Sequence, residues 1–342
     1  MRELARELLA GQEAWVVGGA VRDELLGREL VDLDIACREP EAAARAHAKR
    51  SGGAPFPLSE RHGAWRVAFE DGRTVDFTPL PGTIEDDLAT RDFTINAIAI
   101  PLAGGEPVDP HGGRGDLGAR LIRAVSVEVF TDDPLRLMRA VRLEDELGFQ
   151  LEPETERLVR EQAQFVTQPA RERTLAELVR LSVDGYRRAD ELGLLAPLEG
   201  SSAGLDRPEL VDRPAFRLVA VFGDALRRFP VSNETKRYAQ KLLRAGAPED
   251  GSPRSIHRFR RATEPWALDA LVFAGAPELE DAVLEARERE PAEPLLRGDE
   301  LGLPPGPEIG RLLELIAEER AAGTISTREE ALELVRKEVT KK

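Results

Sequence analysis

The most constraining feature of the sequence is the stretch VVGGAVRDELLGRELVDLDIA at residues 16–36. An apolar strand runs into two glycines, a short helix opening with Arg22 follows, and a second strand carries Asp32 and Asp34. Alternate residues of a strand point to the same face, so the two carboxylates converge while Leu33 faces a core. Carboxylates beside a glycine turn at a helix N-terminus suit a divalent cation and phosphate. The chemistry that this stretch suggests is nucleotidyl transfer.

A third carboxylate, Asp76, lies in the apolar stretch TVDFT. An acid within a buried strand needs a cation or a hydrogen-bond partner. Three strand-borne carboxylates suit Mg²⁺, and two such ions can activate an attacking 3′-hydroxyl and stabilise the leaving pyrophosphate. We therefore expect a catalytic site built on Asp32, Asp34 and Asp76, with Mg²⁺ as its cofactor.

Phosphate would be held at the glycine turn. Gly18 and Gly19 can expose backbone N–H groups to a triphosphate, and Arg22 adds a positive charge. The sequence contains no GxxxxGK[ST] motif, which excludes the P-loop class of nucleotide-binding proteins.

The pattern of the chain changes near residue 124. Before it, WRVAF, TVDFT and INAIAI read as strands; after it, DPLRLMRAVRLEDELGF, PETERLVREQA, ERTLAELVRLS and RLVAVFGDALRRF have helical spacing. The predicted fold is therefore α+β, a mixed sheet with helices followed by an all-helical remainder. The predicted domains are a catalytic head at 1–124, a helical neck at 125–195, a body at 196–290 and a tail at 291–342.

Composition bounds the setting and the partners. The chain has 342 residues, one cysteine and no long apolar stretch, so a cytoplasmic protein with no membrane partner is expected. The net charge of −15 argues against a nucleic-acid partner, but residues 233–261 hold eight basic and three acidic residues. This strip could bind an RNA backbone or be a solvated helix face. The candidate contacts within it are Lys236, Arg237, Lys241, Arg258, Arg260 and Arg261.

Four motifs together resemble one family. VVGGAVRDELLG with DLDIA, RDFTINAIAI, VDPHGG and DDPLRLMRAVRLEDELGF occur in the order found in class II tRNA nucleotidyltransferases, which include CCA-adding enzymes and bacterial poly(A) polymerases. The ending LPPGPEIGRLLELIAEERAAGTISTREEAL is also similar to this family. The resemblance implies a polymerase-β-like head, a helical tail at 291–342 as a tRNA-binding region, tRNA as partner at its acceptor and T arm, and CTP, with ATP as a second nucleotide.

The resemblance also implies a role for each matching residue. Asp32 and Asp34 would bind the metals, with Asp76 as the third acid, and Gly18, Gly19 and Arg22 would hold the triphosphate. Arg91 and Asp92 would read the ribose, with Asn96 as structural support. Asp133 and Arg136 would read the base, and Arg139 and Arg142, further along the same helical face, would contact phosphate or brace that template.

Hydrogen bonding supports the base-reading pair independently. Cytosine and adenine both present an amine donor beside a ring-nitrogen acceptor, which a carboxylate and a guanidinium would match. We expect Asp133 and Arg136 to lie one turn apart on a helix. The alternative is an ordinary intrahelical salt bridge between them.

Two departures from the family pattern bear on the product. Thr90 stands where many members have the first of two arginines, and only PLPGTIEDDLATR separates TVDFT from DFTINA. Full CCA-adding members carry a long loop there, so the short segment favours a CC-adding enzyme that leaves the terminal A to a separate enzyme. Full CCA addition and poly(A) synthesis remain alternatives, as does, in another class, a non-catalytic RNA-binding protein.

Overall fold

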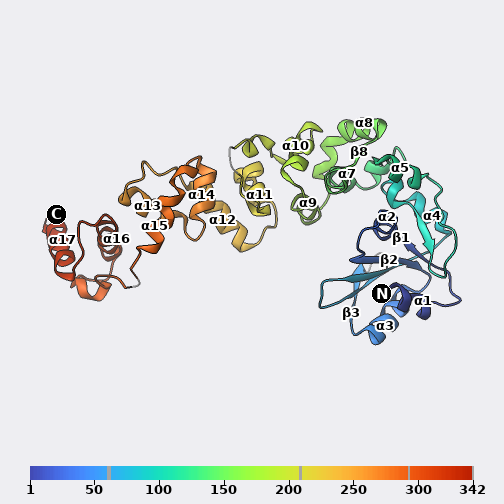
Figure 1. The fold of residues 1–342 in the computed structure, drawn as a ribbon, viewed down its shortest axis with the longest axis horizontal. Helices are drawn as coiled ribbons and strands as arrows, with labels where there is room; N and C mark the ends of the chain where they lie inside the picture. The colour runs from blue at the N-terminus through green and yellow to red at the C-terminus, as the bar shows by residue number, and fades with distance from the viewer. Residues whose placement is uncertain (60–62, 208–209, 292, 341–342) are drawn as a thin grey trace. The chain divides into compact units, whose positions relative to one another are not determined.

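The structure is a computed structural model that describes residues 1–59, 63–207, 210–291 and 293–340. The chain divides into two compact units, Met1–Leu198 and Glu199–Lys342. The first contains a six-stranded sheet with helices around it, and the second is helical (Figure 1). Across the described ranges, no helix combines the length and apolar character needed to cross a membrane.

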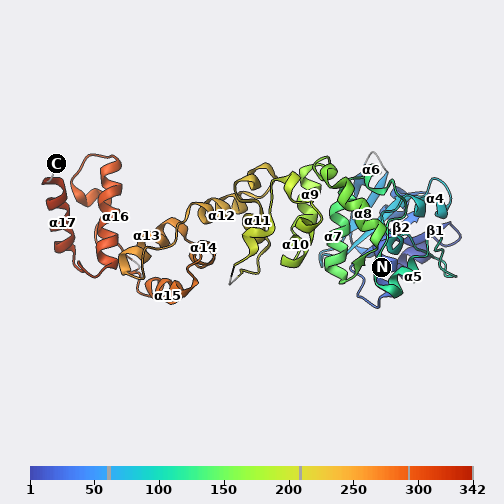
Figure 2. The same cartoon turned by 90° about the horizontal axis from the view of Figure 1, so that it is seen from above.

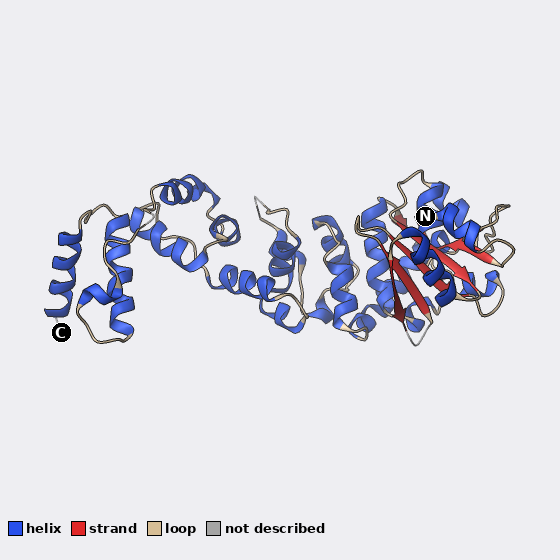
Figure 3. Ribbon diagram, turned by 90° about the horizontal axis from the view of Figure 1, so that it is seen from below, coloured by secondary structure: helices blue, strands red, loops and turns tan. Residues whose placement is uncertain are grey.

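The sheet of the first unit is mixed, as predicted. In spatial order its strands are β3 (Ala54–Ser59), β4 (Ala64–Ala68), β5 (Thr74–Pro79), β2 (Asp32–Cys37), β1 (Ala14–Val17) and β6 (Ala99–Pro101). β2 and β5 run parallel, and every other neighbouring pair is antiparallel (strands red in Figure 3). The parallel pair brings the strand of Asp32 and Asp34 beside the strand of Asp76.

The two faces of this sheet have different roles. Helix α3 (Pro40–Ser51) packs on one face, where the His47 ring lies 5.8 Å from Phe77 and the Arg45 guanidinium lies 4.7 Å from the ring of Trp65. Leu33 is buried between Asp32 and Asp34 as the alternation predicts. The opposite face carries the acidic residues and is left free of α3.

The remaining elements of the first unit are short helices and one small ladder. They are α1 (Arg2–Leu8), α2 (Gly19–Leu25), α4 (Ile84–Ala89), η1 (Thr94–Asn96), α5 (Gly113–Ala119), α6 (Val129–Asp132), α7 (Leu135–Leu147), α8 (Pro153–Gln162), η2 (Ala163–Thr167), α9 (Arg171–Leu178), α10 (Val183–Glu191) and η3 (Ala196–Leu198). Strands β7 (Leu121–Ile122) and β8 (Gln150–Leu151) pair in parallel.

A capping box fixes the start of α4, which follows β5 after only residues 80–83. The Asp86 backbone N–H donates to Thr83 Oγ1 at 3.2 Å, and the Thr83 N–H donates to Asp86 Oδ2 at 3.0 Å. These two bonds satisfy backbone donors that a helix start leaves free. The sequence segment that was expected to be short is therefore also ordered.

Three expectations about the first unit were wrong in detail. The helix expected to open with Arg22 begins at Gly19, because the backbone turns at Gly18 with a φ of 70°. INAIAI is a strand only from Ala99, since Thr94–Asn96 form a 3-10 turn that directs the side chain of Asn96 into the site. The part after residue 124, expected to be all-helical, also contains one short strand, β8, which pairs with β7.

The second unit consists of helices. They are η4 (Ser202–Leu205), α11 (Pro214–Phe222), η5 (Gly223–Arg228), α12 (Asn233–Arg244), α13 (Pro253–Thr263), α14 (Ala267–Ala274), η6 (Pro277–Leu279), α15 (Glu280–Glu288), η7 (Gly298–Leu301), α16 (Pro307–Ala321) and α17 (Arg328–Thr340) (Figure 2). The helix expected over RLVAVFGDALRRF breaks at Gly223. Leu312, Ile316 and Val335 form part of the core between α16 and α17.

Gly113 provides a test of how the site is supported. A Cβ at this position would lie 2.1 Å from the carbonyl oxygen of Thr94, whereas one at Gly115 of the same helix would meet no atom within 4 Å. We expect Gly113→Ala to lower the free energy of unfolding by about 1–3 kcal/mol, because backbone must move. Gly115→Ala is the matched control and should raise it by up to about 1 kcal/mol. Chemical denaturation checks both, and equal effects would contradict the close packing.

Candidate active site

A single cavity of about 760 Å³ in the first unit collects the site residues expected there from the sequence. Its lining includes Gly18, Gly19, Arg22, Asp32, Asp34, Asp76, Arg91, Asp92, Asp133, Arg136, Arg139 and Arg142. These residues come from segments more than 100 positions apart. The sheet and α2 supply one wall, and the segment before α7 together with α7 supplies another.

The acids lie side by side on the open face of the sheet. Asp34 in β2 is in register with Asp76 in β5, and Asp32 is in register with Thr74, whose hydroxyl donates to Asp32 Oδ1 at 2.7 Å. Burial, followed by the charges of Asp76 and Asp32, raises the pKa of Asp34 to about 6. Carboxylates crowded in this way suit a hard divalent cation, which would relieve their repulsion.

Asp76 has a partner that the sequence did not predict. Arg66 in β4 lies opposite Asp76 and donates to both of its carboxylate oxygens at 2.7 Å. Within the described ranges, no three His, Cys, Asp or Glu side chains form a ready metal cluster. Asp32 and Asp34 therefore fit a cation whose other ligands come from substrate phosphate and water. The alternation of residues within the strand AWRVAF could have placed Arg66 on the opposite face from its apolar neighbours.

Gly18 lets the backbone pass close to two functional side chains. A Cβ there would lie 3.2 Å from Arg91 Nη1 and 3.3 Å from Asp34 Oδ2, and its φ of 70° is also unfavourable for other residues. Arg91 is held by Asp87, one turn earlier, at 2.6 Å. The glycine turn thus lies directly against the carboxylates and a cation, as a phosphate site requires.

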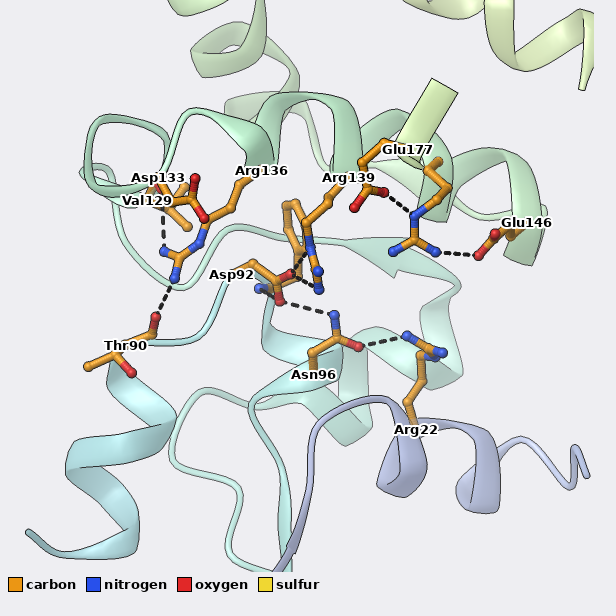
Figure 4. Close-up of polar contacts among 12 residues, drawn as sticks. Arg22, Thr90, Asp92, Asn96, Val129, Asp133, Arg136, Arg139, Glu146 and Glu177 are labelled. Carbon is orange, nitrogen blue, oxygen red and sulfur yellow. Dashed lines mark hydrogen bonds and ion pairs between the residues drawn. The ribbon is translucent and has the colours of Figure 1, made fainter. Parts of the chain in front are cut away.

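A chain of hydrogen bonds connects three regions of the cavity (Figure 4). Arg22 Nη1 donates to Asn96 Oδ1 at 2.8 Å, and Asn96 Nδ2 donates to Asp92 Oδ1 at 3.0 Å. Arg139 in α7 donates to Asp92 Oδ2 from Nε at 2.9 Å and forms an ion pair with it at 2.7 Å. The expected triphosphate arginine, ribose aspartate and template helix are therefore held by one network, with Asn96 in the supporting place expected for it.

Asp92 remains charged although it is buried. Burial by itself would raise its pKa, but the charge of Arg139 and hydrogen bonds from Asn96 and the Phe93 N–H outweigh burial and hold the pKa below its usual range. One carboxylate oxygen faces Arg139 and the other receives two donors. The orientation of Asp92 is consequently fixed.

Asp133 and Arg136 differ from expectation. Asp133 is not in a helix but lies between α6 and α7 with extended backbone, because Pro134 follows it. Its carboxylate pairs with Arg173 of α9 at 2.7 Å rather than with Arg136. Arg136 donates to the carbonyl oxygens of Thr90 at 2.7 Å and Val129 at 3.3 Å (Figure 4). The two side chains are thus fixed separately, and the intrahelical salt bridge is not formed.

Arg142 is a brace rather than an open phosphate ligand. Its side chain is buried and pairs with Glu177 of α9 and, at 2.5 Å, with Glu146 of α7. The pair with Glu177 connects α7 to α9, the helix that also supplies Arg173 to Asp133. Of the two roles expected for Arg142, its contacts favour support of the template.

The basic strip at 233–261 is divided by its contacts. Arginines of α13 pair with glutamates of α16: Arg254 with Glu319 at 2.7 Å, Arg258 with Glu318 at 2.6 Å and Arg261 with Glu314 at 2.9 Å. Arg260 is 8% exposed and pairs with Glu264 and Glu290. On α12, by contrast, Lys236, Arg237 and Lys241 form no ion pair with the part of the chain that the structure describes.

Known proteins match both the sequence and the fold. A family model for the poly A polymerase head domain matches residues 14–80 and 61–123. The chain is 34% identical to the A-adding tRNA nucleotidyltransferase of Deinococcus radiodurans over 95% of each chain. It is 32% identical to the CC-adding tRNA nucleotidyltransferase of Thermus thermophilus over 94% of this chain and 92% of that protein.

The fold agrees with a solved relative. The Thermotoga maritima CCA-adding enzyme complexed with tRNA matches with a TM-score of 0.75 at 24% identity, over 98% of this chain and 95% of that chain. The predicted fold class is therefore confirmed. The chain belongs to the family of tRNA nucleotidyltransferases and poly(A) polymerases that includes the A-adding, CC-adding and CCA-adding enzymes, and it is a nucleotidyltransferase.

Proposed function

We propose that this enzyme adds C residues to the 3′ end of tRNA from CTP, without a nucleic-acid template and with release of pyrophosphate. The observation that carries the proposal is the single cavity in which carboxylates, a glycine turn, a fixed aspartate, the Asp133 carboxylate and the Arg136 guanidinium meet. Each group would contact one part of a nucleotide: the reacting phosphate, the triphosphate, the ribose or the base. The RNA substrate is proposed by analogy with the A-adding and CC-adding relatives, which are tRNA nucleotidyltransferases.

The residues that line the cavity are proposed to have separate roles. Asp32 and Asp34 hold the reacting centre, Gly18 and Gly19 present backbone N–H groups to the triphosphate, and Arg22 adds positive charge to it. Arg91 and Asp92 would position the ribose. Because Asp92 is fixed on two sides, it can accept a hydrogen bond from a ribose hydroxyl without reorganising.

Mg²⁺ fits the donor set of Asp32 and Asp34. When bound, it would supply activation of the attacking 3′-hydroxyl and charge stabilisation for the leaving pyrophosphate. Arg66 neutralises Asp76, so Asp76 contributes less negative charge to this centre than an unpaired acid would. We propose Asp76 as a support for Asp34 rather than as a primary ligand.

The base would be read by Asp133 and Arg136. Asp133 accepts from the exocyclic amine and Arg136 donates to the ring nitrogen, a pattern that cytosine and adenine share and that uracil and guanine reverse. Arg136 is held through the backbone carbonyl of Thr90, which any residue type can provide. The departure at Thr90 therefore leaves this contact intact.

The product is proposed to be CC rather than CCA. The supporting observation is the connection of residues 80–83 between β5 and α4, where full CCA-adding members of the family have a long loop. A separate A-adding enzyme would then complete the tRNA. The A-adding relative from Deinococcus makes addition of the terminal A alone the second candidate.

An end-point assay discriminates these products. Purified enzyme is given tRNA lacking CCA, tRNA ending in C and tRNA ending in CC, each with CTP, ATP or both. We expect two residues on the first primer, one on the second and none on the third, measured by gel. Extension of only the third primer, by A, would identify an A-adding enzyme. Three residues on the first would mean full CCA addition, and a long tail would mean poly(A) synthesis.

Asp34→Ala should remove the chemistry without unfolding the protein. Loss of a metal ligand worth several kcal/mol predicts a fall in CTP incorporation of about 10³-fold or more. Chelation should abolish wild-type incorporation and added Mg²⁺ should restore it. Asp71→Ala, which removes an exposed acid paired with Arg73 in the turn between β4 and β5, is the matched control and should stay within about twofold. Activity retained in Asp34→Ala would contradict the proposal.

Arg136→Ala should relax nucleotide choice more than nucleotide binding. The loss of a donor to the ring nitrogen removes about 1–3 kcal/mol of discrimination, measured as kcat/KM for CTP against UTP. Arg136→Lys should not restore it, because lysine lacks the planar fork. Arg114→Ala, an exposed arginine outside the cavity lining, should leave the ratio unchanged. Unaltered selectivity in Arg136→Ala would assign base reading elsewhere.

The contacts of the basic strip predict which of its helices binds tRNA. We expect a triple variant of α12, Lys236→Ala with Arg237→Ala and Lys241→Ala, to weaken tRNA binding and to lower the slope of log K against log salt by about two to three. The double variant Arg258→Ala with Arg261→Ala should have the smaller effect, because both arginines are already paired. If a salt titration showed a larger effect for the α13 double variant than for the α12 triple variant, α13 would instead be the helix that contacts tRNA.

A further inference from the structure

Phe56 lies at the end of the row of residues that forms the catalytic face of the sheet. Phe56 in β3 is opposite Arg66 in β4, Arg66 is opposite Asp76 in β5, and Asp76 is beside Asp34 in β2. Residues in register on neighbouring strands point to the same face. The ring of Phe56 is therefore on the face of the acids, while Trp65 and its neighbours on the other face meet α3.

The exposure of Phe56 is unusual for this chain. The side chain is 41% exposed, and it is the only aromatic residue among the exposed large hydrophobic residues within the described ranges. The other exposed ones are aliphatic. An aromatic ring left in solvent on the same face of a sheet as a reaction centre is a candidate binding surface.

The exposed ring of Phe56 does not mark an edge at which another strand would extend the sheet. β3 is the outermost strand, and Pro55 and Pro57 flank Phe56 within it. Proline has no backbone N–H, so this edge offers few donors to a further strand. The exposed feature at this edge is the ring rather than the backbone.

We propose that Phe56 is the stacking platform for a base in the single-stranded 3′ end of the RNA primer. This inference rests on the proposed function, which supplies the RNA. Three strand spacings, about 14 Å, separate Phe56 from Asp34, so the stacked base belongs to the primer behind its reacting end and not to the incoming nucleotide. Stacking on an aromatic ring tolerates any base, which suits an enzyme that must hold primers of differing sequence.

The test measures primer binding directly. A tRNA lacking CCA, with 2-aminopurine at each of its last three positions in turn, is titrated with wild type and Phe56→Ala in the absence of nucleotide. We expect Phe56→Ala to raise the Kd and the KM for tRNA about 5- to 20-fold. It should also remove the fluorescence quench at one of these positions and leave the KM for CTP within about twofold. Phe56→Trp should restore both binding and quench.

Leu58→Ala is the matched control, since Leu58 is 45% exposed on the same strand but lacks a ring. It should leave the Kd within about twofold. An unchanged Kd and quench in Phe56→Ala would overturn the proposal. If Leu58→Ala and Phe56→Trp weakened tRNA binding as much as Phe56→Ala does, stacking would be overturned in favour of a general apolar contact. Because wild-type extension of the same tRNA is measured alongside, failure of the platform is distinguishable from failure of the proposed function.

Discussion

The ion pair between Asp92 and Arg139 is the interaction on which the rest of the site depends. It joins the loop after α4 to the helix α7, and so holds the sheet wall of the cavity against the wall formed by α7 and the segment before it. Because Asp92 is buried, loss of Arg139 would leave an uncompensated charge, which is far more costly than loss of a surface pair. The contact from Asn96 to Arg22 extends the same constraint to the glycine turn.

Arginine is the residue that organises the first unit. Arg66, Arg91, Arg136, Arg139 and Arg142 each line the cavity, and each is held by a carboxylate or a backbone carbonyl. Pre-paired guanidinium groups keep their orientation when substrate is absent, which reduces the reorganisation required when an anionic nucleotide enters. The protein thus places positive charge around a cluster of acids despite a net charge of −15.

The accuracy of the sequence-based predictions follows from the range of the interactions involved. Strand periodicity and motif order predicted the acids of β2 and β5, because both depend on neighbouring residues. The partners of these residues were not predictable: Arg66 lies ten positions from Asp76, and Arg173 lies forty from Asp133. The non-helical backbone at Asp133 follows from Pro134, which disfavours helix at the residue before it. The sequence contained this signal, but the helical spacing of the following residues led us to expect a helix. For the strip at 233–261, composition identified the charge but could not reveal that α16 pairs with three of its eight basic residues.

The capping box at Thr83 bears on how the enzyme would limit the number of residues that it adds. It anchors the first turn of α4, while the bond from Arg136 to the Thr90 carbonyl anchors the residue after its last turn. We infer that this segment, tied at both ends and lining the cavity through Asp87 and Thr90, would hold the cavity at one depth while nucleotides are added. With the cavity fixed, the variable that differs between one addition and the next is the length of RNA already inside. Under the proposed function, the length of the growing primer would then determine where synthesis ends.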